Sequence, residues 1–177
     1  MYPWGIKFSS SDLPWENAFI FLHGLFGDES DWDFLLPFLP RNSLSISLAL
    51  PGHHSTLRSA FPLDRASYFD GLSNLFHALK NFKTVTAIGY SMGARVILES
   101  VLLNRSPVTA LFLESFNPGI AVKTEREERL RADQKLLRDI TDGEGFKRFL
   151  EQWYRMPLFG TLTMKENFKE ICLAKST

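Results

Sequence analysis

The sequence predicts an α/β protein with a mostly parallel sheet, and two observations support that prediction. Four short apolar runs each end at a turn signal, and longer segments with helical spacing separate some of them. The runs are continuous rather than alternating, which is typical of strands buried on both faces of a parallel sheet. They cover Ala18–Leu22, Leu44–Leu48, Val85–Gly89 and Val108–Glu114. Strands that alternate with helices favour the α/β class.

The helical segments divide the chain into two parts. In the first part the apolar side chains of Tyr68–Phe82 fall on one stripe, and Ala94–Leu103 has the composition of a buried helix. After Pro118 the predicted elements are all helical, and they cover Lys123–Asp139, Gly143–Tyr154 and Met164–Ala174. We therefore expect a core over residues 1–117 and a helical cap over residues 118–177.

The overall composition excludes several functional classes. The formal net charge is zero, so the chain has no electrostatic footprint for nucleic acid. No apolar run approaches the ~20 residues that span a bilayer, and the first residues do not resemble a signal peptide. Cys172 is the single cysteine and cannot form an internal disulfide, which suits the cytoplasm. No cluster of metal ligands is visible, so we expect neither a metal nor an organic cofactor.

The segment Gly89-Tyr90-Ser91-Met92-Gly93 matches the pattern G-x-S-x-G. In that pattern the serine sits on a sharp strand-to-helix turn, so that its hydroxyl projects above the sheet. The flanking glycines allow the strand and the helix to approach closely. A predicted strand precedes Ser91 and a predicted helix follows it, which favours a nucleophile turn. The alternative is a glycine-rich turn of any α/β protein with a serine by chance.

The turn after the first apolar run contains His23-Gly24. In this architecture such a loop donates one backbone N–H to an oxyanion hole, and the residue after the nucleophile donates the other. That second donor would be the N–H group of Met92. Taken alone, His23 is better explained as an ordinary turn histidine. In "LPGHH", residues 50–54, a structural or pocket-lining role for His53 and His54 is favoured over a catalytic one.

With HG, LPGH and GYSMG in this order, the chain resembles the α/β-hydrolase superfamily. Further segments make it similar to the 2-succinyl-6-hydroxy-2,4-cyclohexadiene-1-carboxylate synthase family of menaquinone biosynthesis. They are the serine turn through Arg95, "LESFNPGI" (113–120), "EREERLRAD" (125–133) and "WYRMPLFGTL" (153–162). The resemblance runs from about Phe19 to the last residue. It implies an α/β-hydrolase fold and a carbon–oxygen lyase that eliminates pyruvate from 2-succinyl-5-enolpyruvyl-6-hydroxy-3-cyclohexene-1-carboxylate.

The resemblance also implies roles for particular residues. Ser91 would act as the base, tuned by a histidine, while the Leu25 and Met92 N–H groups hold the developing oxyanion. A substrate with several carboxylates requires cations, and arginine offers bidentate geometry. The substrate-binding residues implied by the resemblance are His23, Tyr90, Arg95, Arg129, Trp153, Tyr154 and Lys175. Lys175 stands where an arginine is expected. Without the resemblance, a solvated helix face is favoured for Arg129, and Trp153 and Tyr154 could simply pack the cap.

The histidine and acid that should activate Ser91 are missing from their expected place. A triad on this fold runs in the order serine, acid, histidine, but all four histidines precede Ser91. We therefore expect a chain truncated within its cap that lacks the last strands of the sheet, is inactive alone, and is completed by a second chain or a missing segment. Val108–Glu114 would then be an exposed apolar edge. Two other hypotheses stay open: an esterase or acyl hydrolase of the same fold, and a catalytically inactive remnant that only binds anions.

Overall fold

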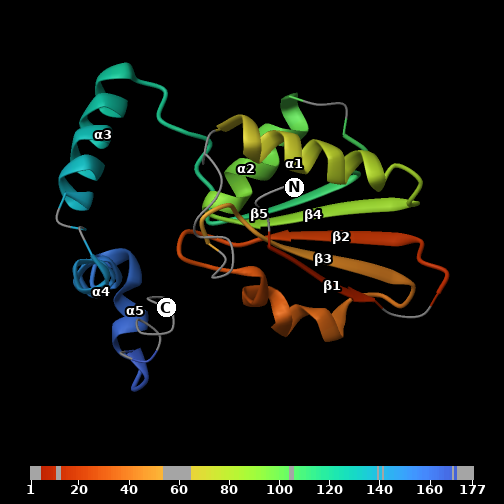
Figure 1. Ribbon diagram of the computed structural model, residues 1–177, viewed down its shortest axis with the longest axis horizontal. Helices are drawn as coiled ribbons and strands as arrows, with labels where there is room; N and C mark the ends of the chain where they lie inside the picture. Colours follow the sequence, from red (N-terminus) through yellow and green to blue (C-terminus); the bar gives the residue numbers. More distant parts are fainter. Residues whose placement is uncertain are drawn as a thin grey trace. The chain divides into compact units, whose positions relative to one another are not determined.

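Five strands form one sheet in the computed structural model of the chain, in the order β1-β3-β2-β4-β5 (Figure 1). The structure describes residues 5–10, 13–53, 65–103, 106–138, 140, 142–168 and 170. The strands are β1 (Gly5–Ser10), β2 (Asn17–Leu22), β3 (Ser43–Ala49), β4 (Thr84–Tyr90) and β5 (Ala110–Glu114). The pairs β2–β3, β2–β4 and β4–β5 are parallel, and β1 pairs with β3 in the antiparallel direction. The prediction of a mostly parallel sheet is confirmed.

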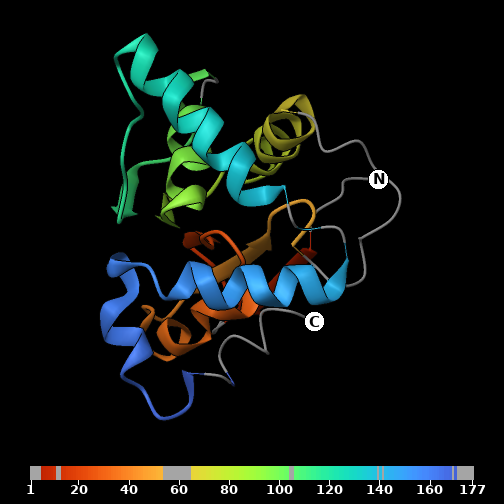
Figure 2. The same cartoon turned by 90° about the vertical axis from the view of Figure 1, so that its left-hand side faces the viewer.

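The continuous apolar runs coincide with the central strands. In β2 the side chains of Ala18, Ile20 and Leu22 are fully buried in the main hydrophobic cluster. This cluster is covered by α1 (Arg65–Ala78) and α2 (Met92–Leu103), which lie side by side on one face of the sheet (Figures 1 and 2). The predicted helices in this part of the chain are thus present, each starting two or three residues earlier than expected.

Two elements of this part were not predicted. The strand β1 alternates buried and exposed side chains, with Ile6 48% and Phe8 62% exposed, so it contains no continuous apolar run. The second is the 3₁₀ helix η1 (Glu29–Phe38), drawn in orange in Figure 1 on the face of the sheet opposite α1 and α2. It contains Pro37 and lacks helical periodicity. Its start is fixed by a capping box between Asp28 and Asp31.

The chain divides into two compact units, residues 1–118 and 119–177. The second unit contains α3 (Lys123–Leu137), α4 (Gly143–Tyr154), the 3₁₀ turn η3 (Pro157–Phe159) and α5 (Gly160–Thr163). No side chain of α3 is buried, whereas α4 buries Phe149 and Leu150. The Asp142 side chain caps α4 by accepting a hydrogen bond from the N–H of Gly145 at 2.6 Å. The two predicted helices at α3 and α4 are confirmed.

The third predicted helix of this unit, Met164–Ala174, does not begin where the sequence suggested. Residues 164–167 form turns and bends, and a short helix, α5, lies just before them. Residues 168 and 170, within the predicted range, are helical. Met164, directly after α5, is 84% exposed. Only the predicted start is wrong, because the polar stretch KEN follows Met164 directly and provides no buried face there. Residues from 171 onward lie outside the described residues.

Among the helices that the structure describes, none has both the length and the apolar character required to cross a bilayer. Within the same residues, no group of three or more histidine, cysteine, aspartate or glutamate side chains is arranged to hold a metal ion.

Candidate active site

Ser91 occupies the turn between β4 and α2, in the backbone conformation expected for a nucleophile turn. Its φ angle is 49°, in the left-handed region that non-glycine residues rarely adopt. Its N–H donates a hydrogen bond to the carbonyl oxygen of Glu114 at 2.9 Å, and its own carbonyl accepts one from the N–H of Arg95 at 3.3 Å. The strained turn is therefore held by the end of β5 on one side and by the first turn of α2 on the other.

The two glycines of the motif are needed for close backbone approach. A Cβ atom on Gly89 would lie 2.6 Å from the backbone of Ala94. A Cβ atom on Gly93 would lie 2.5 Å from the carbonyl oxygens of Leu22 and His23. Because these neighbours are backbone atoms, they cannot move aside as a flexible side chain could. The motif is thus explained by strand-to-helix packing, as the sequence suggested.

The loop after β2 is attached directly to the serine turn. The Gly93 N–H donates to the carbonyl oxygen of His23 at 3.1 Å, and the Gly27 N–H closes a turn onto the carbonyl of Gly24 at 3.0 Å. Within the described residues, the backbone N–H groups of Leu25 and Met92 have no hydrogen-bond acceptor. The bond between Gly93 and His23 joins the two segments that contain these N–H groups. Because neither group is paired, both remain available to a developing oxyanion.

His23 is buried, and both of its ring nitrogens are occupied. Nδ1 lies 2.6 Å from the carbonyl oxygen of Gly24, and Nε2 lies 2.9 Å from the N–H of Leu50. A carbonyl can only accept and an N–H can only donate, so the ring is neutral with its proton on Nδ1. Burial lowers the pKa of His23 from 6.5 to about 4. The lone pair that a general base needs is already used, so His23 cannot take the proton of Ser91.

The other two histidines that the structure describes, His53 and His77, form no hydrogen bond with Ser91. The ring of His53 packs against that of His23 at a centroid distance of 5.0 Å, and its Nδ1 lies 3.3 Å from the carbonyl oxygen of Pro51. Burial lowers the pKa of His53. His77 is exposed on α1. His54 lies outside the described residues.

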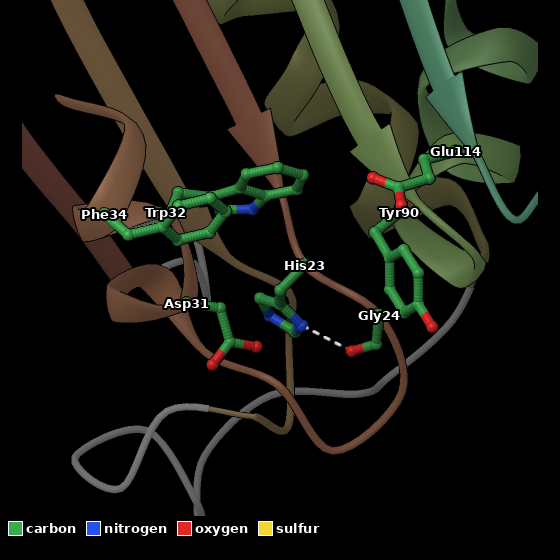
Figure 3. Close-up of a pocket in the computed structure, with 7 residues that line it drawn as sticks. All are labelled: His23, Gly24, Asp31, Trp32, Phe34, Tyr90 and Glu114. Atoms are coloured by element: carbon green, nitrogen blue, oxygen red, sulfur yellow. Dashed lines mark hydrogen bonds between the residues drawn. The ribbon is translucent and has the colours of Figure 1, made fainter. Parts of the chain in front are cut away.

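A cavity of about 210 Å³ opens beside the loop after β2 (Figure 3). Two of the predicted site residues, His23 and Tyr90, line it. Its other lining residues are Gly24, Asp31, Trp32, Phe34 and Glu114. Asp31, Trp32 and Phe34 were not predicted as site residues, because they belong to the unpredicted helix η1. Glu114 could have been found, since it ends a parallel strand on the edge of the sheet where Ser91 lies.

A second, more open hollow of about 470 Å³ lies next to this cavity. It is mainly apolar and shares Trp32 and Glu114 with the first cavity. Its remaining lining residues are Leu35, Ile88, Phe112 and Leu113. Phe112 is 63% exposed on the outer strand β5, as expected for an apolar edge. The site region thus has an aromatic and aliphatic wall with carboxylates at its border.

Arg95 is exposed on the first turn of α2. Its Nε donates to the carbonyl oxygen of Asn117 at 3.0 Å, which holds the side chain beside the segment after β5. Since Nε is occupied by a backbone carbonyl, the terminal nitrogens of the guanidinium are left for an anion. Arg95 does not line the 210 Å³ cavity.

The predicted site residues of the second unit have partners within that unit. Arg129 forms an ion pair with Asp133 at 2.8 Å on the exposed face of α3. Trp153 and Tyr154 both pack against Phe159, at centroid distances of 6.1 Å and 5.3 Å. These contacts give the three residues structural roles within the second unit, and their roles in substrate binding stay a prediction. Lys175 lies outside the described residues.

The parallel sheet, the strained serine turn and the loop bound to it define an α/β hydrolase. The alpha/beta hydrolase family model matches residues 19–170, and the chain belongs to that family. Within the family, the chain is similar to proteins that share one synthase name. A Bacillus subtilis protein assigned by name as 2-succinyl-6-hydroxy-2,4-cyclohexadiene-1-carboxylate synthase is 36% identical over 149 residues, covering 81% of this chain and 52% of that protein.

Two further comparisons agree. A Haemophilus influenzae protein assigned the same synthase name is 30% identical, over 89% of this chain and 64% of that protein. The solved structure of MenH from S. aureus superposes with a TM-score of 0.79 at 27% identity, covering 97% of this chain and 66% of that one. The chain thus spans about half to two thirds of the length of these relatives.

Proposed function

We propose that this chain carries the nucleophile and oxyanion part of a 2-succinyl-6-hydroxy-2,4-cyclohexadiene-1-carboxylate synthase, acting in the cytoplasm. The observation that supports the proposal most directly is the hydrogen bond from Gly93 to His23. This bond joins the loop that contains the free Leu25 N–H group to the turn that contains Ser91 and the free Met92 N–H group. The synthase names of the relatives supply the substrate class.

The proposed reaction follows from comparing the two ring systems. A 3-cyclohexene that loses a proton from ring carbon 2 and the enolpyruvyl group from carbon 5 becomes a 2,4-cyclohexadiene. Once Ser91 has passed its own proton to the histidine that another segment supplies, its Oγ takes the ring proton. The electron pair moves onto the succinyl ketone oxygen, and the Leu25 and Met92 N–H groups stabilise that oxyanion. When the oxyanion collapses, the second ring double bond forms and the carbon–oxygen bond breaks. Pyruvate leaves as its enolate and then takes up a proton.

Charge complementarity assigns Arg95 to the carboxylates of the substrate. Its terminal guanidinium nitrogens lie on the first turn of the helix that Ser91 precedes, and they offer bidentate geometry to a carboxylate. Asp31 and Glu114 at the 210 Å³ cavity would repel the same groups. The substrate carboxylates are therefore expected on the Arg95 side, with Arg129, Lys175, Trp153 and Tyr154 as further contributors from the second unit.

Residues 1–177 do not supply the histidine and the acid that would activate Ser91. His23 is committed to two hydrogen bonds, and the printed sequence has no histidine after Ser91. An unassisted serine hydroxyl is a weak base and a weak nucleophile. We therefore propose that residues 1–177 alone bind the substrate but turn it over negligibly, and that another polypeptide segment supplies the histidine and the acid.

The test compares two reactions of the protein isolated as its native cell makes it. Pyruvate release from the polycarboxylated substrate and hydrolysis of a neutral p-nitrophenyl ester are measured for the wild type, Ser91→Ala and Arg95→Ala. Arg41→Ala, which removes an exposed arginine elsewhere, is the matched control. The proposal expects pyruvate release that is lost in Ser91→Ala and reduced about tenfold or more in Arg95→Ala but not in Arg41→Ala.

Other results would overturn the proposal. Ester hydrolysis that needs Ser91, without any pyruvate release, would identify an acyl hydrolase. Turnover by residues 1–177 alone that disappears in Ser91→Ala would contradict the expected need for a second segment. If neither reaction occurs but Arg95 is needed to bind the polycarboxylate, the protein is an anion-binding remnant.

A further inference from the structure

The 210 Å³ cavity has few polar groups that are free to contact a ligand. Both ring nitrogens of His23 are engaged with backbone groups, and the Asp31 carboxylate accepts from the N–H of Asp28 at the start of η1. Of the other polar side chains that line the cavity, Glu114 is an exposed carboxylate and Tyr90 is 39% exposed. The remaining polar group is the indole N–H of Trp32.

The Trp32 indole N–H is a buried donor without an acceptor. The residue is only 6% exposed, and its Nε1 has no hydrogen-bond partner within the part of the chain that the structure describes. In Figure 3 the nitrogen lies on the edge of the ring nearer to His23. The ring packs against Phe21 at a centroid distance of 5.4 Å, which restricts its orientation. A buried indole N–H usually has a partner, so an unpaired one in a residue that lines a cavity points to a ligand.

We propose that Trp32 is a ligand-binding residue whose indole N–H donates a hydrogen bond to an uncharged carbonyl or hydroxyl oxygen. The ligand oxygen is uncharged because Asp31 and Glu114 line the same cavity and disfavour a second carboxylate there. A neutral donor such as indole is also sufficient for a ketone or an alcohol. The aromatic rings of Trp32, Phe34 and Tyr90 suit the apolar atoms of a small carbocycle.

This inference deepens the proposed function and rests on it for the identity of the natural ligand. The succinyl ketone of the proposed substrate is already assigned to the Leu25 and Met92 N–H groups, which leaves the ring hydroxyl as an uncharged oxygen for Trp32. The carboxylates of the substrate would lie on the Arg95 side and its uncharged face in the cavity. Trp32 would thereby determine which face of the ring is turned toward Ser91.

The experiment uses cyclohexanone as the first probe, because it carries one carbonyl and no charge. The indole N–H resonances of the four tryptophans are followed by nitrogen-correlated proton NMR during the titration, with Trp32→Phe identifying the Trp32 signal. The expected result is a downfield shift of the Trp32 signal alone, with the other three tryptophans as internal controls. Cyclohexanecarboxylate, the matched anionic probe, should shift it far less. An unmoved Trp32 signal with cyclohexanone would overturn the proposal.

A second variant separates binding from packing. Replacing Trp32 by 3-benzothienylalanine keeps the shape of the ring and removes only the N–H donor. Cyclohexanone should then bind about fivefold more weakly, as expected for one lost hydrogen bond. The thermal midpoint of the free protein should not fall, because the removed donor had no partner in it. Unchanged ketone affinity together with a lowered midpoint would show a packing role only and would contradict the proposal.

A third titration distinguishes this inference from the proposed function. The probe is the synthase product, 2-succinyl-6-hydroxy-2,4-cyclohexadiene-1-carboxylate. If it perturbs the Ser91 and Arg95 amides but leaves the Trp32 indole unmoved, the role of Trp32 is wrong and the proposed function survives. If cyclohexanone shifts Trp32 but the product does not bind, the proposed function fails while Trp32 remains a donor to uncharged ligands.

Discussion

The backbone N–H of Gly93 donates a hydrogen bond to the carbonyl oxygen of His23 across 3.1 Å. This bond joins the first turn of α2 to the loop that follows β2. It fixes the Met92 and Leu25 N–H groups relative to Ser91, because each of them lies one or two residues from the bonded atoms. The side chain of His23 adds two further bonds, to Gly24 and Leu50, and so connects the same loop to the end of β3.

The close approach at Gly93 predicts that Gly93→Ala is destabilising. The added methyl group would lie 2.5 Å from two backbone oxygens, so the loop or the helix must move. We expect a loss of about 1–3 kcal/mol in the free energy of unfolding, typical of forced overpacking. Gly143→Ala is the matched control, since a Cβ there meets nothing within 4 Å. Equal stabilities of the two variants in denaturant titrations would show that the contact has no effect.

The positive φ of Ser91 predicts an unusual order of stability among its variants. In an ordinary helix alanine is more stable than glycine by roughly 1 kcal/mol, but at φ 49° the Cβ atom is itself unfavourable. We therefore expect Ser91→Gly to be at least as stable as Ser91→Ala. Ser73, within α1, is the control site, where Ser73→Ala should be the more stable of the pair. Thermal unfolding of the four variants measures both differences, and the same order at both sites would contradict strain at Ser91.

The lowered pKa of His23 predicts loss of stability in acid. The folded protein holds the ring neutral with a pKa of about 4, whereas the unfolded chain binds a proton with a pKa near 6.5. Between these values the unfolded state binds more protons, so stability falls as the pH falls from about 6.5 to about 4. The size of the effect is ~3 kcal/mol, on the scale of 1.36 kcal/mol for each pKa unit. Burial of His53 acts in the same direction.

His23→Gln separates this contribution from the titration of carboxylates. The variant is expected to be less stable at neutral pH, because it loses at least one buried hydrogen bond. Its unfolding free energy should nevertheless change less between pH 6.5 and pH 4 than that of the wild type. Denaturant titrations across that range provide the measurement. Parallel pH profiles for the two proteins would mean that His23 does not determine the acid sensitivity.

The second unit offers an independent test at the start of α4. Asp142 accepts a hydrogen bond from the Gly145 N–H at 2.6 Å, and replacing an N-cap of this type by alanine costs about 1 kcal/mol. Asp142→Ala should lower the helix content or the unfolding midpoint by a corresponding amount. Glu151→Ala, at an exposed position of the same helix, should leave both nearly unchanged. Circular dichroism compares them, and an equal effect would argue against the cap.

The sequence by itself determined the central strands and the serine turn, because both depend on local patterns. A strand buried on both faces must be continuously apolar, and β2, β3 and β4 begin and end within one residue of such runs. The two glycines around Ser91 are likewise a local pattern, since the close packing of strand and helix leaves no room for a Cβ atom at either position. The family resemblance was carried by the same local motifs.

Tertiary structure alone decided how the site is lined and which groups remain free. Trp32 and Asp31 come from η1, which has no helical periodicity and contains a proline, so nothing local indicated that it would pack beside the end of β2. The tautomer of His23 depends on Gly24 and on Leu50, which is 27 residues away in the chain. Such partners are selected by packing and burial of polar groups, which depend on distant parts of the chain and leave no spacing in the sequence.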